Sequence, residues 1–298
     1  MLDSCAVSPV PIVRPLLPAD VPAAAAVGGA ALSDAIPVEF HPRTPDEQAA
    51  QTRRQQRRVA HLQATDPGGA WVAEVDGEIV GLTLALIRDG VWGLSLFGVR
   101  PGLQGEGIGG ALLGAALGYA EGCRGGIILS TSDPRAMRSY ARAGFAIKPA
   151  LAAAGPINRS RIPGGLASRP GDVVADRDLL DAVSRHVRTA AHGPDLQTFV
   201  DGGAALLVLD GRGFALHRDG SPALLAAVDD AAATDLLWSC LAGGGAGATA
   251  HVDFITERND WAVATVLEAG LSLSPEGPVF VRGETGPFAP YLPSGAYL

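Results

Sequence analysis

The chain has 298 residues, of which 47% are hydrophobic and 18% charged, a balance that supports buried cores in about two domains and excludes an intrinsically disordered chain. Its net charge of -8 excludes general electrostatic attraction to nucleic acid or to an anionic membrane. Three cysteines without paired spacing give neither a disulfide framework nor a zinc site, and no signal peptide or membrane-spanning run is apparent, so we expect a soluble, cytoplasmic protein.

The first third of the chain has clear local signals. Residues 11–17 are expected to form a short strand, and an alanine-rich helix is expected from Asp20 to about Leu32. A second helix is expected over residues 44–64, because Thr44 and Glu47 have the spacing of a capping box.

Three apolar runs between residues 70 and 99 are separated by Asp76-Gly77 and Asp89-Gly90. Asp-Gly pairs between apolar runs favour two-residue hairpin turns, so the sequence predicts an antiparallel meander. After a glycine-rich turn we expect a helix, a strand and a second helix that ends at Gly144, at residues 109–121, 126–131 and 134–143.

Residues 151–172 are rich in Gly, Pro, Ser and Arg and are expected to form a linker. The second half then repeats the plan of the first. We expect helices and strands in the order helix 174–190, strands 203–210, 213–218 and 222–228, helix 231–241, strand 250–255 and helix 259–268.

Two short patterns in the two halves have the same internal spacing, which indicates a duplication. Each follows an apolar strand and ends a helix at glycine. The matched sets are Asp133, Ala136, Tyr140, Gly144 and Phe145 in the first half, and Asn259, Ala262, Val266, Gly270 and Leu271 in the second.

The segment from Gln104 to Gly110 carries the chemistry. Its glycines let the main chain turn so that several N–H groups point into one concavity at the positive end of a helix, which favours a pyrophosphate. Gly105, Gly107 and Gly110 also fit the dinucleotide fingerprint, which would make the chain an oxidoreductase. That interpretation is disfavoured, because the preceding strand closes an antiparallel meander and five residues intervene before the glycines.

The segment Val99-Arg100-Pro101 followed by Gln104–Gly109 resembles motif A of the GNAT acetyltransferase superfamily, and Tyr140–Phe145 resembles the end of its motif B. The resemblance covers about residues 10–150, and the second half resembles a degenerate repeat. It implies an α/β fold with two tandem GNAT-like domains, each a mostly antiparallel mixed sheet flanked by helices. Residues 1–160 would bind acyl-CoA, and residues 161–298 would lack the pyrophosphate loop.

The resemblance also implies roles for individual residues. The main chain of Phe97, Gly98 and Val99 would pair with the pantetheine arm of acetyl-CoA beside a splayed strand, and Tyr140 would protonate the departing thiolate. Asp133 stands where the family often has an Asn that contacts the cofactor, but a carboxylate cannot donate a hydrogen bond. The pyrophosphate would be held by the main-chain amides of Gln104, Gly105, Glu106, Gly107, Ile108 and Gly109.

No general base is evident in the strand over residues 91–99, where many relatives carry a Glu. Glu39 and His41 follow the first helix, in the region where relatives bind the acceptor, and either could remove a proton from an ammonium group. In the second half, the acidic segment DDAAATDLL replaces the glycine-rich loop and Val266 replaces the tyrosine. We therefore expect that this half neither binds acyl-CoA nor catalyses.

These inferences predict an acetyl-CoA-dependent N-acetyltransferase that acts without a metal on a small-molecule or peptide amine, as a monomer or homodimer. The alternative is a non-catalytic acyl-CoA-binding or regulatory protein. The aromatic, proline-rich segment 286–298 is expected to be ordered and to cover a sheet edge or line the acceptor cleft.

Overall fold

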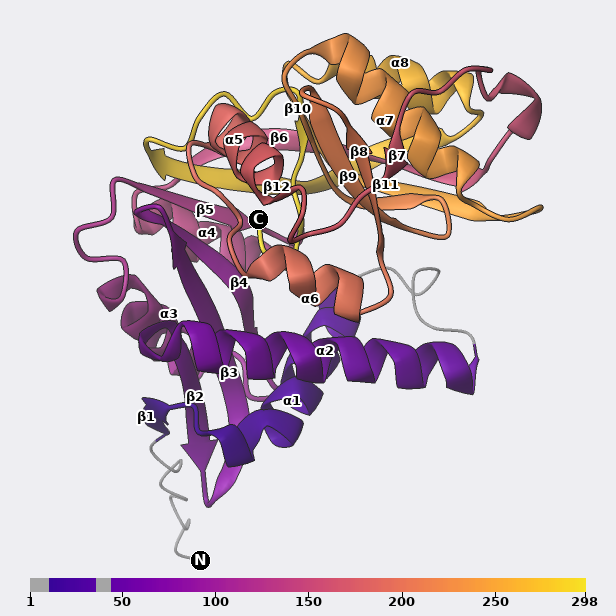
Figure 1. The fold of residues 1–298 in the computed structure, drawn as a ribbon. Helices are drawn as coiled ribbons and strands as arrows, with labels where there is room; N and C mark the ends of the chain where they lie inside the picture. Colours follow the sequence, from indigo (N-terminus) through magenta and orange to yellow (C-terminus); the bar gives the residue numbers. More distant parts are fainter. Residues whose placement is uncertain (1–10, 36–43) are drawn as a thin grey trace, which may run out of the picture. The chain divides into compact units, whose positions relative to one another are not determined.

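The computed structural model describes residues 11–35 and 44–298 (Figure 1). Contacts divide the chain into two compact units. Unit 1 comprises the residues up to Leu86 together with Leu96–Glu121, and unit 2 comprises Ile87–Ser95 together with Gly122–Leu298.

Unit 1 contains an antiparallel sheet and three helices. Strand β1 pairs with β2, and β2 pairs with β3, in both cases antiparallel. The elements of this unit, with strands β3 and β4 shared between the units, are β1 (Ile12–Pro15), α1 (Val21–Ala35), α2 (Pro45–Thr65), β2 (Ala70–Val75), β3 (Glu78–Arg88), β4 (Val91–Val99) and α3 (Ile108–Gly118).

The local signals of the first third are confirmed. The Thr44 hydroxyl accepts a hydrogen bond from the Glu47 amide, and the Glu47 carboxylate accepts one from the Thr44 amide, each at 3.2 Å. Both Asp-Gly turns have positive φ at each residue, 50° and 81° at Asp76-Gly77 and 45° and 73° at Asp89-Gly90. Positive φ at both central residues is the requirement of the hairpin turn that the sequence predicts.

Unit 2 contains the remaining helices and strands. Its elements are β5 (Gly125–Leu129), α4 (Pro134–Arg142), β6 (Ala146–Pro156), β7 (Arg169–Pro170), α5 (Arg177–Arg188), α6 (Asp195–Asp201), β8 (Ala205–Leu209), β9 (Gly213–Arg218), β10 (Ser221–Ala227), α7 (Asp230–Ala242), β11 (Thr249–Thr256), α8 (Asp260–Glu268), β12 (Ser272–Gly283) and β13 (Tyr291–Leu292).

The order of elements repeats along the chain. Apart from short 3-10 helices, the order β1-α1-α2-β2-β3-β4-α3-β5-α4-β6 recurs as β7-α5-α6-β8-β9-β10-α7-β11-α8-β12. This complete repetition supports the duplication that the matched patterns around residues 133–145 and 259–271 indicate.

The two halves of the sequence exchange a strand within unit 2. Strand β12 lies between β5 and β6, and β6 lies between β12 and β11. Val279 of β12 is in register with Leu129 of β5, and Phe280 with Ile147 of β6. On its other edge, β6 pairs with β11, where Leu151 is opposite Ile255. Strand β5 of the first half thus pairs with β12 of the second, and β11 of the second half pairs with β6 of the first.

The prediction of a linker over residues 151–172 is wrong for its first part, because residues 151–156 belong to β6. Apart from Leu151, the segment is built from Ala, Gly and Pro, which have low strand propensity, but hydrogen bonds to strands on both edges override that preference. Strand β12 and helix α6 are not anticipated by the sequence. Pro275, Gly277 and Pro278 interrupt the apolar pattern of β12, and its bulge lies between Glu276 and Val279.

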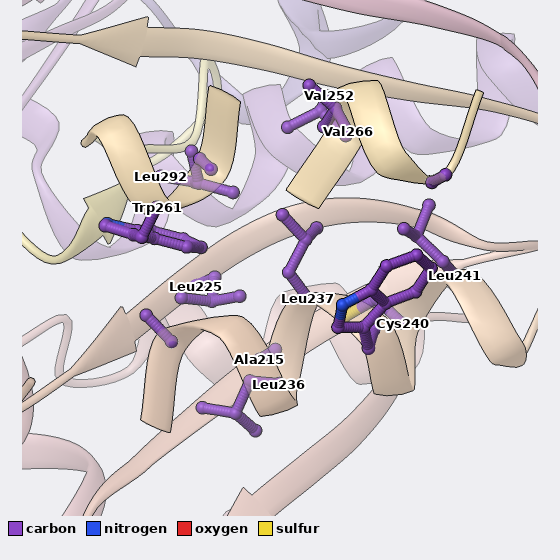
Figure 2. Packing of buried hydrophobic residues seen from close by; sticks show 14 of the residues in the cluster. Ala215, Leu225, Leu236, Leu237, Cys240, Leu241, Val252, Trp261, Val266 and Leu292 are labelled. Atoms are coloured by element: carbon purple, nitrogen blue, oxygen red, sulfur yellow. The ribbon is translucent and has the colours of Figure 1, made fainter. Parts of the chain in front are cut away.

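A second sheet of unit 2 has the strand order β13-β10-β9-β8-β7. Its core includes Ala215 of β9, Leu225 of β10 and Leu237 of α7, packed with side chains of α8 and β11 (Figure 2). The segment 286–298 is ordered, and β13 covers the edge of β10 as expected, with Leu292 opposite Leu225.

Because β12 is the neighbour of both β5 and β6, and β11 is the other neighbour of β6, a chain that ends at residue 160 leaves one edge of β5 and both edges of β6 unpaired. We expect this shortened chain to be aggregated or unfolded under conditions where the full chain is folded. Circular dichroism and size-exclusion chromatography of both chains measure the difference. A shortened chain that is monomeric and unfolds cooperatively would contradict the strand exchange.

Candidate active site

The main-chain conformation of the glycine-rich turn in unit 1 requires glycine at two positions. Gly105 and Gly107 have φ values of 96° and 82°, in the left-handed region that favours glycine. A Cβ atom built at either position meets no atom of the protein within 4 Å. The turn is therefore open on the side where these glycines lack side chains, which allows a ligand to approach the main chain.

Helix α3 begins at this turn without a side-chain cap. Its N-cap residue is Gly107, and its first turn contains no acidic residue. The first-turn amides of a helix have no partner within the helix, and the helix dipole places positive partial charge there. Ile108, Gly109 and Gly110 thus present amides suited to an anion such as a pyrophosphate.

The last residues of β4 are packed against the rest of unit 1. The ideal Cβ position of Gly98 lies 2.6 Å from the Cβ of Ala31, so only glycine permits this approach to α1. The Phe97 ring lies 3.3 Å from the corresponding position of Gly109. Val99 is 8% exposed and belongs to a core cluster with Ile108 and Leu112. The end of β4 and the start of α3 are therefore packed against each other in the same core cluster.

The parallel pairing of β4 with β5 has a short register. It runs from Val91 opposite Gly125 to Leu94 opposite Ile128, while β4 itself continues to Val99. Because β5 ends at Leu129, the last part of β4 extends beyond this pairing.

Tyr140 and Asp133 lie together on α4, in unit 2. Tyr140 is 5% exposed, and its ring packs edge-on against Phe280 with a centroid distance of 5.3 Å. Burial, and next the charge of Asp133, raise the pKa of Tyr140 above that of a free phenol. The Tyr140 hydroxyl is therefore fully protonated at neutral pH, which is the state that a general acid needs.

Asp133 has a structural role on the same helix. It is the N-cap of α4 and accepts a hydrogen bond from the Arg135 amide at 2.8 Å. The Arg135 guanidinium also pairs with this carboxylate at 3.0 Å. Burial favours a higher pKa for Asp133, but the hydrogen bonds from the Arg135 side chain and amide, together with the charge of Arg135, outweigh it and hold this pKa below its usual range. The two candidates for a general base, Glu39 and His41, lie outside the described residues.

The second half has different chemistry at the equivalent helix start. Asp229 is the N-cap of α7, where its carboxylate accepts a hydrogen bond from the Ala232 amide at 2.9 Å and pairs with Arg212 at 2.6 Å. The main chain of β10 is also paired, because Ala226 lies opposite Tyr291 of β13 and the Ala227 amide donates to Pro290. In the second half, Asp229 thus binds the helix-start amides, and β13 covers the strand edge. Their equivalents in the first half are the groups proposed to bind the cofactor.

Residues 11–35 and 44–298 contain neither a candidate metal centre nor a membrane-spanning helix. In these ranges no group of three or more His, Cys, Asp or Glu side chains is arranged to hold a metal ion. Within the same described residues, no helix combines the length and the apolar character that crossing a membrane requires.

Residues 34–145 match the model of the acetyltransferase (GNAT) family, a range that contains both the glycine-rich turn and Tyr140. This part of the chain is therefore similar to a GNAT domain. The chain is 38% identical over 86 residues to a mycothiol acetyltransferase from Streptomyces avermitilis, a match that spans 27% of this chain and 28% of that relative's length.

Solved structures match over nearly the whole chain. A protein from Pyrococcus horikoshii described as an acetyltransferase has a TM-score of 0.77 at 16% identity, covering 97% of this chain and 96% of its own. A GCN5-related N-acetyltransferase from Kribbella flavida has a TM-score of 0.57 at 14% identity, covering 92% of this chain and 72% of its own. These likenesses establish the mixed α/β fold that the sequence predicts.

The conformation of the turn can be tested with two alanine substitutions. Gly107→Ala should destabilise the protein by about 1–2 kcal/mol, because an L-residue at positive φ is strained even where space is open. Gly110→Ala is the matched control, since this exposed glycine also has open space around it but lies within the helix. This substitution should stabilise the protein by up to about 1 kcal/mol, because alanine has the higher helix propensity. Denaturant unfolding measures both values, and equal effects would contradict the conformation of the turn.

Proposed function

We propose that this protein is an acetyl-CoA-dependent N-acetyltransferase that transfers the acetyl group to a primary amine by direct attack on the thioester. The observation that carries the proposal is the uncapped start of α3 at Gly107, within a segment that matches the GNAT family. Uncapped amides at a helix start favour the binding of a pyrophosphate group. The family match indicates that this group is the pyrophosphate of acetyl-CoA.

In this proposal the first half binds the cofactor and the second half does not. The amides from Gln104 to Gly109 hold the pyrophosphate, and the main chain of Phe97–Val99 pairs with the pantetheine arm as an added strand. Residues 161–298 form a degenerate GNAT-like domain. The Asp229 cap of α7 supports this assignment, because a second negative charge at that helix start would be repelled.

The chemistry requires stabilisation of an oxyanion and protonation of a leaving group. The N–H group near Val99 would donate a hydrogen bond to the thioester oxygen as negative charge develops on it. Tyr140 would give its proton to the thiolate of CoA. The proton transfer is uphill, because the pKa of Tyr140 is raised above an ordinary value of about 10 while a thiol has a pKa of about 8.5. Precise alignment of the hydroxyl with the sulfur is therefore required.

The acceptor is proposed as a small or peptide amine. The similarity to a mycothiol acetyltransferase makes the acceptor of that enzyme the first candidate. The net charge of -8 favours encounter with a cationic amine and says little about specificity.

Release of the CoA thiol tests the proposed activity. The purified protein is incubated with acetyl-CoA and each of a panel of amines, namely the acceptor of mycothiol acetyltransferase, glucosamine, ethanolamine, lysine and spermidine. We expect amine-dependent thiol release and an N-acetylated product by mass spectrometry. Binding of acetyl-CoA without thiol release from any amine would instead favour a non-catalytic acyl-CoA-binding protein.

Replacement of Tyr140 by Phe tests the proposed acid. The ring keeps its packing on Phe280, so we expect kcat to fall by about 100-fold or more while acetyl-CoA still binds. Tyr119→Phe is the control, because that hydroxyl donates to Asp66 in unit 1 and has no proposed role. Comparable kcat values for the two variants would exclude Tyr140 as the acid.

A further inference from the structure

We propose that Glu276 of β12 is the general base that removes a proton from the acceptor's ammonium group. The assignment rests on the proposed function and supplies the base that the strand 91–99 lacks. The candidate comes from the second half of the sequence, which has no cofactor loop of its own but contributes β12 to the sheet.

The bulge of β12 lies against the end of β5. The Ser130 amide donates a hydrogen bond to the Pro278 carbonyl at 3.1 Å, which continues the ladder beyond the pair of Val279 and Leu129. A Cβ atom on Gly277 would lie 1.9 Å from the Ser130 carbonyl oxygen, so the two main chains are in close contact. Glu276 is therefore held near the end of β5, and β12 lies two strand spacings, about 10 Å, from β4 where β4 pairs with β5.

The register places Glu276 and Tyr140 on opposite faces of the sheet. Glu276 is opposite Ala150 and Val279 is opposite Lys148, and these two β6 residues share one face. Phe280 follows Val279, so its ring points to the other face, where it packs on Tyr140. Transfer requires the base at the attacking nitrogen and the acid at the departing sulfur, so the two groups need not contact each other.

The surroundings of Glu276 suit a base at neutral pH. Burial, and next the charge of Asp253 on β11, raise the pKa of Glu276 from 4.5 to about 7, although the Gly277 amide opposes the shift. The other charged groups on this face are His251, which acts on Asp253, and Lys148, which is paired with Glu257 at 2.6 Å. A base with a pKa near the working pH combines the ionised state with useful proton affinity.

The proposed step balances in atoms and electrons. The Glu276 carboxylate takes one proton from the acceptor's ammonium, and the nitrogen lone pair then forms the C–N bond at the thioester carbon. The C–S bond breaks with its electron pair on sulfur, which takes the Tyr140 proton. The phenolate recovers a proton from the new amide nitrogen, and Glu276 releases its proton to water.

Two amines of different basicity test this assignment. Ethylamine is a cation at neutral pH and must lose a proton before attack, whereas 2,2,2-trifluoroethylamine is largely neutral. For Glu276→Gln we expect kcat with ethylamine to fall by about 100-fold or more and kcat with trifluoroethylamine to change far less. Glu268→Gln, on the exposed end of α8, is the matched control and should leave both rates unchanged.

The pH dependence gives a second readout. The wild-type rate with ethylamine should fall as the pH decreases through about 7, because Glu276 becomes protonated. In Glu276→Gln this limb near pH 7 should be replaced by a continuous rise of the rate with pH, because only the free amine can then attack. The folded-state pKa exceeds the unfolded value, so ionised Glu276 destabilises the fold at high pH. Glu276→Gln should therefore raise Tm at pH 8 more than at pH 4.

Each other outcome has a defined meaning. Equal losses with both amines, or a change in KM alone, would overturn the assignment while leaving the proposed function intact. If Glu276→Gln fails to bind acetyl-CoA, the variant Glu276→Asp is measured instead. Because it retains a carboxylate, its rate should still fall as the pH decreases through about 7. A Glu276→Asp rate without this fall would overturn the assignment. No thiol release from the wild type with these amines or the earlier panel would overturn the proposed function and the base with it.

Discussion

The pairing of β12 with both β5 and β6 is the constraint on which much of unit 2 depends. Strand β12 brings Phe280 against Tyr140 and fixes Gly277 at the end of β5. The second half of the sequence therefore contributes to the first even though it lacks a phosphate-binding turn. The second half therefore cannot be removed without exposing the strand edges that β12 covers.

The two equivalent helix starts illustrate how the copies have diverged. At α3 the N-cap is glycine and the first-turn amides lack a side-chain partner, whereas at α7 the carboxylate of Asp229 occupies that position and Arg212 neutralises it. Anions bind where amides and dipole are left uncompensated. Pairing of β13 with β10 closes the equivalent strand edge as well. One helix start is therefore suited to a ligand, and the other stabilises the fold.

Local signals in the sequence predict local structure well. The capping box at Thr44, the Asp-Gly turns and the glycine turn at Gly105 and Gly107 each depend on a few adjacent residues, so their conformations follow from the sequence. Strand β6 and strand β12 depend on partners more than a hundred residues away, and their compositions oppose strand formation. Glu276 has no motif around it. Its burial and its neighbour Asp253 arise only from the fold.

Calorimetric titration with acetyl-CoA tests the central claim, that one helix start per chain binds the cofactor. Gly110→Glu adds a carboxylate to the exposed first turn of α3 without a positive φ, and Ala231→Glu does the same at α7. The account predicts one site per wild-type chain, lost in Gly110→Glu and unchanged in Ala231→Glu. Two sites per chain, or a single site lost only in Ala231→Glu, would contradict it.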